Sequence, residues 1–173
     1  IFLLDGQAKL RATFNLEGIV ALDMEDIAWH TVGDKNYLLL GDIGDNLKKR
    51  KSIKLYCFEE PTLQAGQSVY TIPAAAIRTI TLGYPDQPRD AEAFFIDPVD
   101  KQLYLISKRD FHAQVFTAPI FDGKASSAYV LENIGSLPFT FVTAADISAT
   151  GDAVLMKNLT QIYYWQRPPN RSL

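Results

Sequence analysis

The sequence has few of the residues that build disulfide frameworks and transition-metal sites. Its 173 residues include one cysteine, Cys57, and two histidines, His30 and His112. One cysteine excludes an intrachain disulfide framework and a cysteine-rich zinc site, and two histidines argue against a histidine-rich metal centre. Cys57 lies within a strand pattern, so we expect it to be a small buried hydrophobe.

Several other features are also missing. No apolar run reaches the roughly 18 residues of a transmembrane helix, so membrane insertion is not expected. The formal net charge of -3 gives no broad basic field, so no nucleic-acid partner is expected. The motifs of serine hydrolases, phosphate-binding loops and dinucleotide-binding folds are absent. The chain begins with Ile1 and has no signal-peptide pattern, so we expect a processed, trimmed or fragmentary chain.

Strand patterns dominate what is present. The chain is 47% hydrophobic and 12% aromatic, and helical periodicity is nearly absent. Residues 73–78 are the best helix candidate, but they lead directly into an apolar run, so we predict a strand with a short lead-in. An Asp5-Gly6 hairpin is predicted between residues 1–4 and 9–14. Three further hairpins are predicted at 25–29 with 37–40, 92–96 with 103–106, and 145–148 with 153–156.

These hairpins belong to a repeat. Each is followed by a third strand that ends near a proline, at residues 53–58, 114–117 and 162–165. A fourth strand is predicted at 77–82 and at 128–131. The repeat favours an all-β protein, a β-propeller with about three four-stranded antiparallel blades, over a β-sandwich. The predicted divisions are 1–18 (outer strands of one blade), 23–84, 90–137 and 143–173 (a partial blade).

A propeller needs four to eight blades to close. We therefore expect these blades to be part of a larger ring, completed by the same polypeptide or by a second chain. Four aromatic residues are expected in the core between blades, namely Trp29, Tyr163, Tyr164 and Trp165.

Acidic residues recur where the innermost strands begin and where the second strands end. In a propeller these positions converge on one face. Facing carboxylates repel unless they are protonated, paired or bound to a metal, and oxygen ligands favour Ca²⁺. The candidate metal ligands are Glu25, Asp26, Asp42, Asp45, Asn46, Glu92 and Asp146. Structural capping by residues 42–46 is the alternative, and Asp26 is alternatively a hydrogen-bonding link between neighbouring blades.

Three cations belong to the same face. Lys108, Arg109 and Lys157 are candidates to hold an anionic substrate such as a phosphate, or alternatively to neutralise the carboxylates. The basic run 48–51 is expected to be a solvated loop. Asp34, Asp97, Asp100 and Asp152 are expected only to stabilise turns at the opposite face.

Four motifs carry a resemblance to known proteins: residues 23–28, 41–46, 84–93 and 143–148. They resemble those of bacterial secreted β-propeller proteins of mostly unknown function. These proteins are loosely similar to calcium-dependent propeller phytases and esterase-like phytase propellers. The resemblance implies a secreted or periplasmic protein in which carboxylates bind Ca²⁺ and basic residues hold phosphate. Ala145 departs from this pattern, because the first two repeats have glutamate there.

Two functions follow. The first is a binding or interaction module with an acidic, calcium-binding channel face, whose partner is a small anionic ligand or a protein. The alternative is a metal-assisted phosphate or ester hydrolase, in which the metal activates water and the cations stabilise the anion. No nucleophile–base pair is visible, which favours the first.

Overall fold

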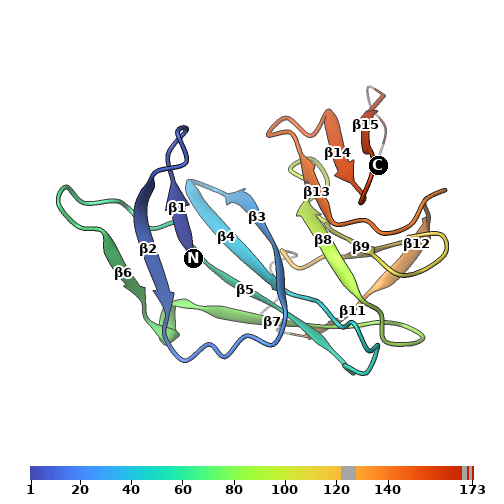
Figure 1. Ribbon diagram of the computed structural model, residues 1–173, viewed down its shortest axis with the longest axis horizontal. Helices are drawn as coiled ribbons and strands as arrows, with labels where there is room; N and C mark the ends of the chain where they lie inside the picture. Colours follow the sequence, from blue (N-terminus) through green and yellow to red (C-terminus); the bar gives the residue numbers. More distant parts are fainter. Residues whose placement is uncertain (122–127, 169–170, 172) are drawn as a thin grey trace.

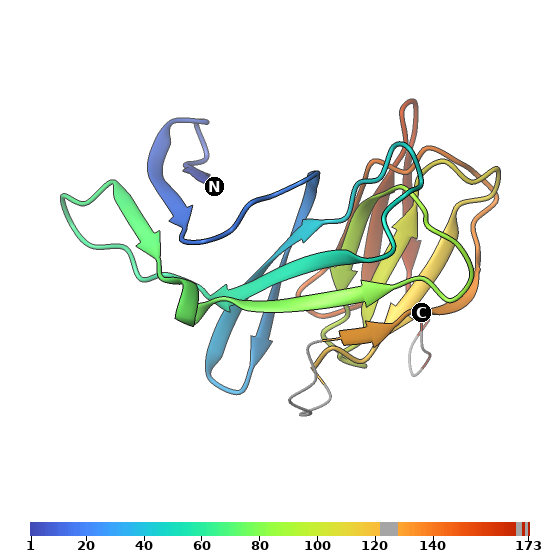
Figure 2. The same ribbon diagram turned by 90° about the horizontal axis from the view of Figure 1, so that it is seen from below.

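The computed structural model describes residues 1–121, 128–168, 171 and 173. Its strands form four small sheets that follow one another in an open arc (Figure 1). This confirms the all-β prediction, and none of the four described sheets closes on itself. Viewed at 90°, the first sheet lies at the opposite end of the molecule from the third and fourth sheets (Figure 2). No helix in the described part of the chain is of a length and apolarity that would let it cross a membrane.

Apart from β11, the strands of the first and second sheets come from the N-terminal half of the chain. The first sheet has the order β1 (Phe2–Leu4), β2 (Leu10–Leu16), β6 (Val69–Ile72). The second has the order β11 (Ala128–Val130), β7 (Arg78–Gly83), β5 (Ile53–Glu59), β4 (Lys35–Asp42), β3 (Met24–Val32). A single 3-10 turn, Ala74–Ala76, precedes β7. This agrees with the prediction of a strand with a short lead-in at 73–78.

The third and fourth sheets contain the C-terminal half. The third has the order β12 (Glu132–Ser136), β10 (Gln114–Ala118), β9 (Leu103–Ser107), β8 (Ala91–Ile96). The fourth has the order β13 (Ala144–Ile147), β14 (Ala153–Lys157), β15 (Ile162–Gln166). Consecutive strands within these sheets pair antiparallel, so the predicted hairpins and third strands are confirmed.

Two strands leave their own repeat and pair in parallel with the preceding sheet. β6 pairs with β2, and β11 pairs with β7. The prediction of residues 128–131 as the fourth strand of their own unit is therefore wrong. That fourth strand is β12, which the sequence analysis missed together with β6. The strand pattern at 128–130 was correct, but pattern alone does not identify the partner strand.

The core formed by the described residues consists of three apolar clusters, each between consecutive sheets. The largest lies between the second and third sheets and includes Leu39, Leu55, Phe94 and Leu105, all fully buried. Phe95, the next residue on β8, points to the opposite face and packs in the cluster between the third and fourth sheets. This alternation is the period of two expected of a strand that is covered on both faces. The third cluster joins the first and second sheets.

The aromatic residues expected in the core lie mostly at the surface. Trp29 is 48% exposed, Tyr164 62% and Trp165 37%. Tyr163 is half-buried, and its ring stacks on Phe139 with centroids 3.8 Å apart. The inter-sheet space is filled mostly by aliphatic and phenylalanine side chains, together with Tyr56, Tyr70 and Tyr104. Cys57 is buried as predicted, and burial raises the pKa of its thiol to about 11.

Candidate functional site

Four loop segments meet where β3 and β8 begin and where β4 and β9 end. The amide of Gly44, after β4, donates to the carbonyl of Asp23, before β3, at 3.2 Å. The amide of Asp45 donates to Oδ1 of Asp90, before β8, at 2.8 Å. The second and third sheets are thus joined by hydrogen bonds at this end, and the polar residues of both gather there.

Asp42, like Asp90, is fully enclosed, with an exposed fraction of 1%. It accepts hydrogen bonds from the amides of Leu22 and Asp23, from the Tyr56 hydroxyl, and from Arg50 Nη1 at 3.0 Å. Burial opposes ionisation of Asp42, but the two amides and Arg50 outweigh it and hold its pKa below the ordinary value. Its position matches the capping alternative.

The side chains of Asp45, Asn46 and Asp90 also have hydrogen-bond or ion-pair partners. Asp45 Oδ2 accepts the Arg50 amide at 2.7 Å. Arg109 bridges the two sheets, since its Nε pairs with Asp90 Oδ2 at 2.6 Å and its Nη2 donates to Asn46 Oδ1. Arg109 therefore occupies the neutralising role that the sequence left open. Asp90 is fully buried, so this pairing offsets its desolvation.

Glu25 lies in an acidic group with Asp23 and Glu92. A Cβ atom added to Gly44 would lie 2.4 Å from Asp23 Oδ2 and 2.7 Å from Glu25 Oε1, so both carboxyls press against this glycine. Burial raises the pKa of Glu25 to about 7, assisted by the charges of Glu92 and Asp23 and by a hydrogen bond between the Asp23 and Glu25 carboxyls. Lys108 forms an ion pair with Glu92 and partly offsets this rise.

Asp26 links the second sheet to the third. Its Oδ2 accepts the amide of Phe94 on β8 at 2.9 Å, and its Oδ1 accepts the amide of Ile27 at 2.9 Å. The structure thus contains the hydrogen-bonded link between sheets that was the alternative for Asp26, and metal binding by Asp26 stays a prediction. Burial raises the pKa of Asp26 to about 6, although the two amides oppose the rise. Asp146 repeats the local geometry, with the amide of Ile147 at 2.8 Å from its Oδ1.

Asp146 and Lys157 lie apart from the loops around Glu25. Both line a hollow of about 300 Å³ that also contains Asp26. Lys157 Nζ donates to the Thr143 hydroxyl at 3.3 Å, so it contacts its own sheet. The structure thus brings together Glu25, Glu92, Lys108 and the residues of 42–46, and it places Asp26 with Asp146 nearby.

Two arginines at this end were not predicted. Arg50, expected in a solvated loop, folds back to bind Asp42 and the Gly44 carbonyl at 2.8 Å. Arg89 is buried, pairs with Asp86 and Asp110, and lies over the Phe116 ring at 5.4 Å. The excess of carboxylates at the loop ends was the available signal, because buried carboxylates need cations.

Asp97 does more than stabilise its turn. Its Oδ1 caps the amide of Val99 at 2.9 Å, as predicted, but its Oδ2 pairs with Arg167 after β15. Asp97 is fully buried. The expectation of a turn-only role was therefore wrong, because a hairpin pattern does not reveal which residue of another sheet covers the turn.

The fit of this group to Ca²⁺ differs between its members. Asp42 does not fit, because donors already occupy both of its oxygens and the Arg50 guanidinium lies 3.0 Å from its Oδ1. Asp45 already has one oxygen, Oδ2, engaged by the Arg50 amide. Among the described residues, no three His, Cys, Asp or Glu side chains gather so as to hold a metal ion. Calcium binding by Glu25 and its neighbours stays a prediction.

No protein-family model matches the chain, and a search of curated proteins found no match.

Proposed function

We propose that the four sheets are consecutive blades of a β-propeller, and that the chain is a binding module whose acidic group, Asp23, Glu25 and Glu92, takes up a basic group of a protein partner. The observation that carries the proposal is the crowding of two carboxyls against Gly44 beside a third. Carboxyls held this close favour uptake of a proton or of a second positive charge.

The arrangement of the first strands supports the propeller. β3 packs beside β8, and β8 beside β13, so the first strands of three successive sheets are neighbours. The amide link from Phe94 to Asp26 connects two of them. Innermost strands that line a common axis have this arrangement.

The charge pairing supports a basic partner over an anionic ligand. Lys108 is paired with Glu92, and Arg109 with Asp90 and Asn46. An anion would have to displace a carboxylate from Lys108 and from Arg109, while Lys157, the third predicted cation, contacts the Thr143 hydroxyl of its own sheet. By contrast, Lys108 is the one cation of the described residues that acts on the Glu25 carboxyl, and it is already paired with Glu92. An ammonium or guanidinium group would therefore gain a partner at Asp23 and Glu25.

The test uses a tetralysine peptide as the probe. We expect it to bind the chain with a dissociation constant that rises with salt, and to bind the Glu25→Gln variant at least fivefold more weakly. Isothermal titration calorimetry at pH 8, where Glu25 is ionised, measures both. Glu59→Gln is the matched control, because Glu59 is exposed and pairs with Lys35 on another part of the surface. Equal affinity for Glu25→Gln and the parent chain would contradict the proposal.

Two further measurements separate the other candidates. The first is the melting temperature with chelator and after Ca²⁺ is added back. A fall with chelator and a recovery with Ca²⁺, both absent in Glu25→Gln, would assign the acidic group to calcium instead. Hydrolysis of a phosphate monoester or carboxylic ester that is lost in Glu25→Gln would favour the metal-assisted hydrolase.

A further inference from the structure

Two connections of the chain repeat an unusual feature. In both the second and third sheets, the segment after the third strand contributes a short strand to the sheet before it. β6 begins 10 residues after β5 ends, and β11 begins 10 residues after β10 ends. Each pairs in parallel with the outermost strand of the preceding sheet, β2 or β7. The same device thus occurs twice at the same spacing.

The two added strands also have the same residue type, tyrosine, at their second position. Tyr70 is the second residue of β6 and lies opposite Phe14, with the two rings stacked at 5.1 Å. Tyr129 is the second residue of β11 and lies opposite Leu82. Tyr70 belongs to the cluster between the first and second sheets, and Tyr129 packs against the cluster between the second and third. An added strand therefore extends a sheet and also inserts a tyrosine between two sheets.

The outermost strand of the third sheet has no such cover among the described residues. All five residues of β12 are exposed, and β12 is the terminal strand of its sheet. The strands that receive β6 and β11 differ, since Ala12, Phe14, Ile80 and Leu82 are all buried. An open strand edge presents unpaired amide and carbonyl groups to another strand.

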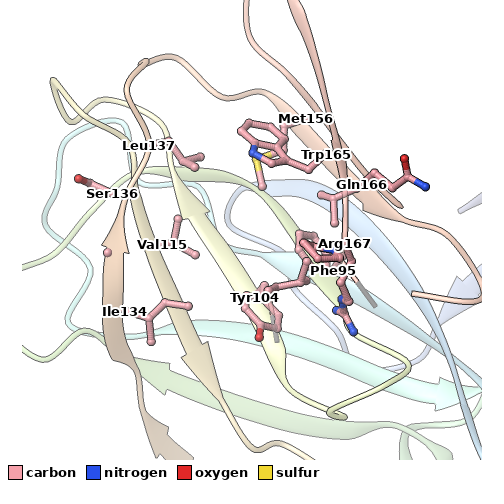
Figure 3. Close-up of a pocket in the computed structure, with 14 residues that line it drawn as sticks. Phe95, Tyr104, Val115, Ile134, Ser136, Leu137, Met156, Trp165, Gln166 and Arg167 are labelled. Carbon is pink, nitrogen blue, oxygen red and sulfur yellow. The ribbon is translucent and has the colours of Figure 1, made fainter. Parts of the chain in front are cut away.

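A pocket of about 330 Å³ lies beside β12, between the third and fourth sheets. Ile134 of β12 lines one side, and Met156 of β14 and Trp165 of β15 line the other (Figure 3). Ile134 is the extra residue of a bulge between β10 and β12. The pocket lies beside β12, the outer strand of the third sheet. In the first and second sheets, the corresponding places beside β2 and β7 hold Tyr70 and Tyr129.

We propose that the free edge of β12 and this pocket bind an extended peptide strand, parallel to β12, that inserts a tyrosine beside Ile134. The occupant is a strand of the type of β6 and β11, in which the tyrosine is flanked by β-branched or small residues. Backbone hydrogen bonds to an open edge supply affinity, and a pocket for an alternate side chain supplies specificity. The proposal does not depend on the acidic group.

The probe is a capped synthetic peptide with the sequence of residues 67–73, Gln-Ser-Val-Tyr-Thr-Ile-Pro. At saturation we expect it to slow amide exchange of alternate residues in 132–136 at least tenfold, and to change the emission of Trp165. A peptide with serine in place of tyrosine is the matched ligand control and should bind at least tenfold more weakly. Hydrogen exchange resolved by NMR reports where protection occurs.

Ile134→Lys places a charge in the pocket and should weaken peptide binding at least tenfold, with little risk to folding because Ile134 is 46% exposed. Val20→Lys, at a residue 83% exposed between β2 and β3, should bind like the parent chain. Protection at β2 instead of β12, or equal affinity for the serine peptide, would overturn the proposal. Self-association that Ile134→Lys abolishes would overturn it by assigning the edge to a second copy. If an apolar dye binds the pocket but the peptide does not protect the amides of 132–136, the proposal is overturned and the site is a small-molecule pocket.

Discussion

The contact between the second and third sheets and the contact between the third and fourth sheets are built differently. The first combines the largest apolar cluster with hydrogen bonds and ion pairs across the loops. The second has a smaller cluster, an open apolar pocket of about 330 Å³ and the buried Arg167–Asp97 pair. β11 extends the second sheet beside the first of these contacts, whereas no described strand extends the third sheet. The inserted strand, more than the hairpins, therefore completes a contact between sheets.

The two phenylalanines of β8 provide the sharpest test of this comparison. Phe94→Ala should lower the free energy of unfolding by about 3–5 kcal/mol, because Phe94 is fully buried in the closed contact. Phe95→Ala should cost about 1–2 kcal/mol less, because Phe95 already lines the pocket and its removal enlarges an open space. Urea denaturation measures both. Equal losses would mean that the two contacts are equally closed.

The Arg167–Asp97 pair tests what holds the more open contact. Asp97→Asn should cost about 3 kcal/mol, since it leaves a buried guanidinium without a counter-charge. Asp100→Asn is the control, because Asp100 caps Gln102 at 2.8 Å and accepts the Tyr104 hydroxyl at 2.7 Å, with no cation involved. A loss below about 1 kcal/mol for Asp97→Asn would show that the pocket-side cluster alone holds the sheets together.

The smallest expected effect is the pH response of the closed contact. The folded chain holds the Glu25 proton up to a pKa of about 7, against an ordinary value of 4.5. Since the folded state then binds more protons than the unfolded one, stability should fall as the pH rises from about 4.5 to about 7. Glu25→Gln should flatten this fall, and Asp26, whose pKa is about 6, should leave a residual slope. Melting temperatures at pH 5 and pH 8 measure it, and an unchanged slope in Glu25→Gln would contradict the assignment.

Strand positions could be predicted because alternating apolar residues and turn chemistry are local signals. The Gly33-Asp34 turn and the hairpin around Asp5-Gly6 lie where the sequence placed them. The pairing of β6 and β11 could not be predicted, because a strand of three or four residues carries no record of its partner. The surface position of Trp29 was missed for a related reason: an aromatic residue in a strand does not show which face is covered.

For the candidate site, the sequence could predict which loops lie together but not which side chains pair. The repeat placed Glu25, Glu92 and Lys108 at one end, and the structure brings them together. The role of each carboxylate depended on cations that no spacing reveals. Arg50 binds Asp42 from a loop that was expected to be solvated, and Arg167, which follows the last strand of the fourth sheet, pairs with Asp97 of the third sheet. The partner of a long side chain depends on which segments pack together in the folded chain, and local sequence patterns do not reveal that packing.

The inserted strands also set an order of events during synthesis. Because β6 and β11 come from the repeat that follows, β2 and β7 stay without their neighbour until that repeat's third strand has left the ribosome. A nascent chain that stalls between repeats therefore presents an unpaired strand to other nascent chains, which is a route to aggregation. Fast emergence of residues 59–72 and 118–130 should protect it.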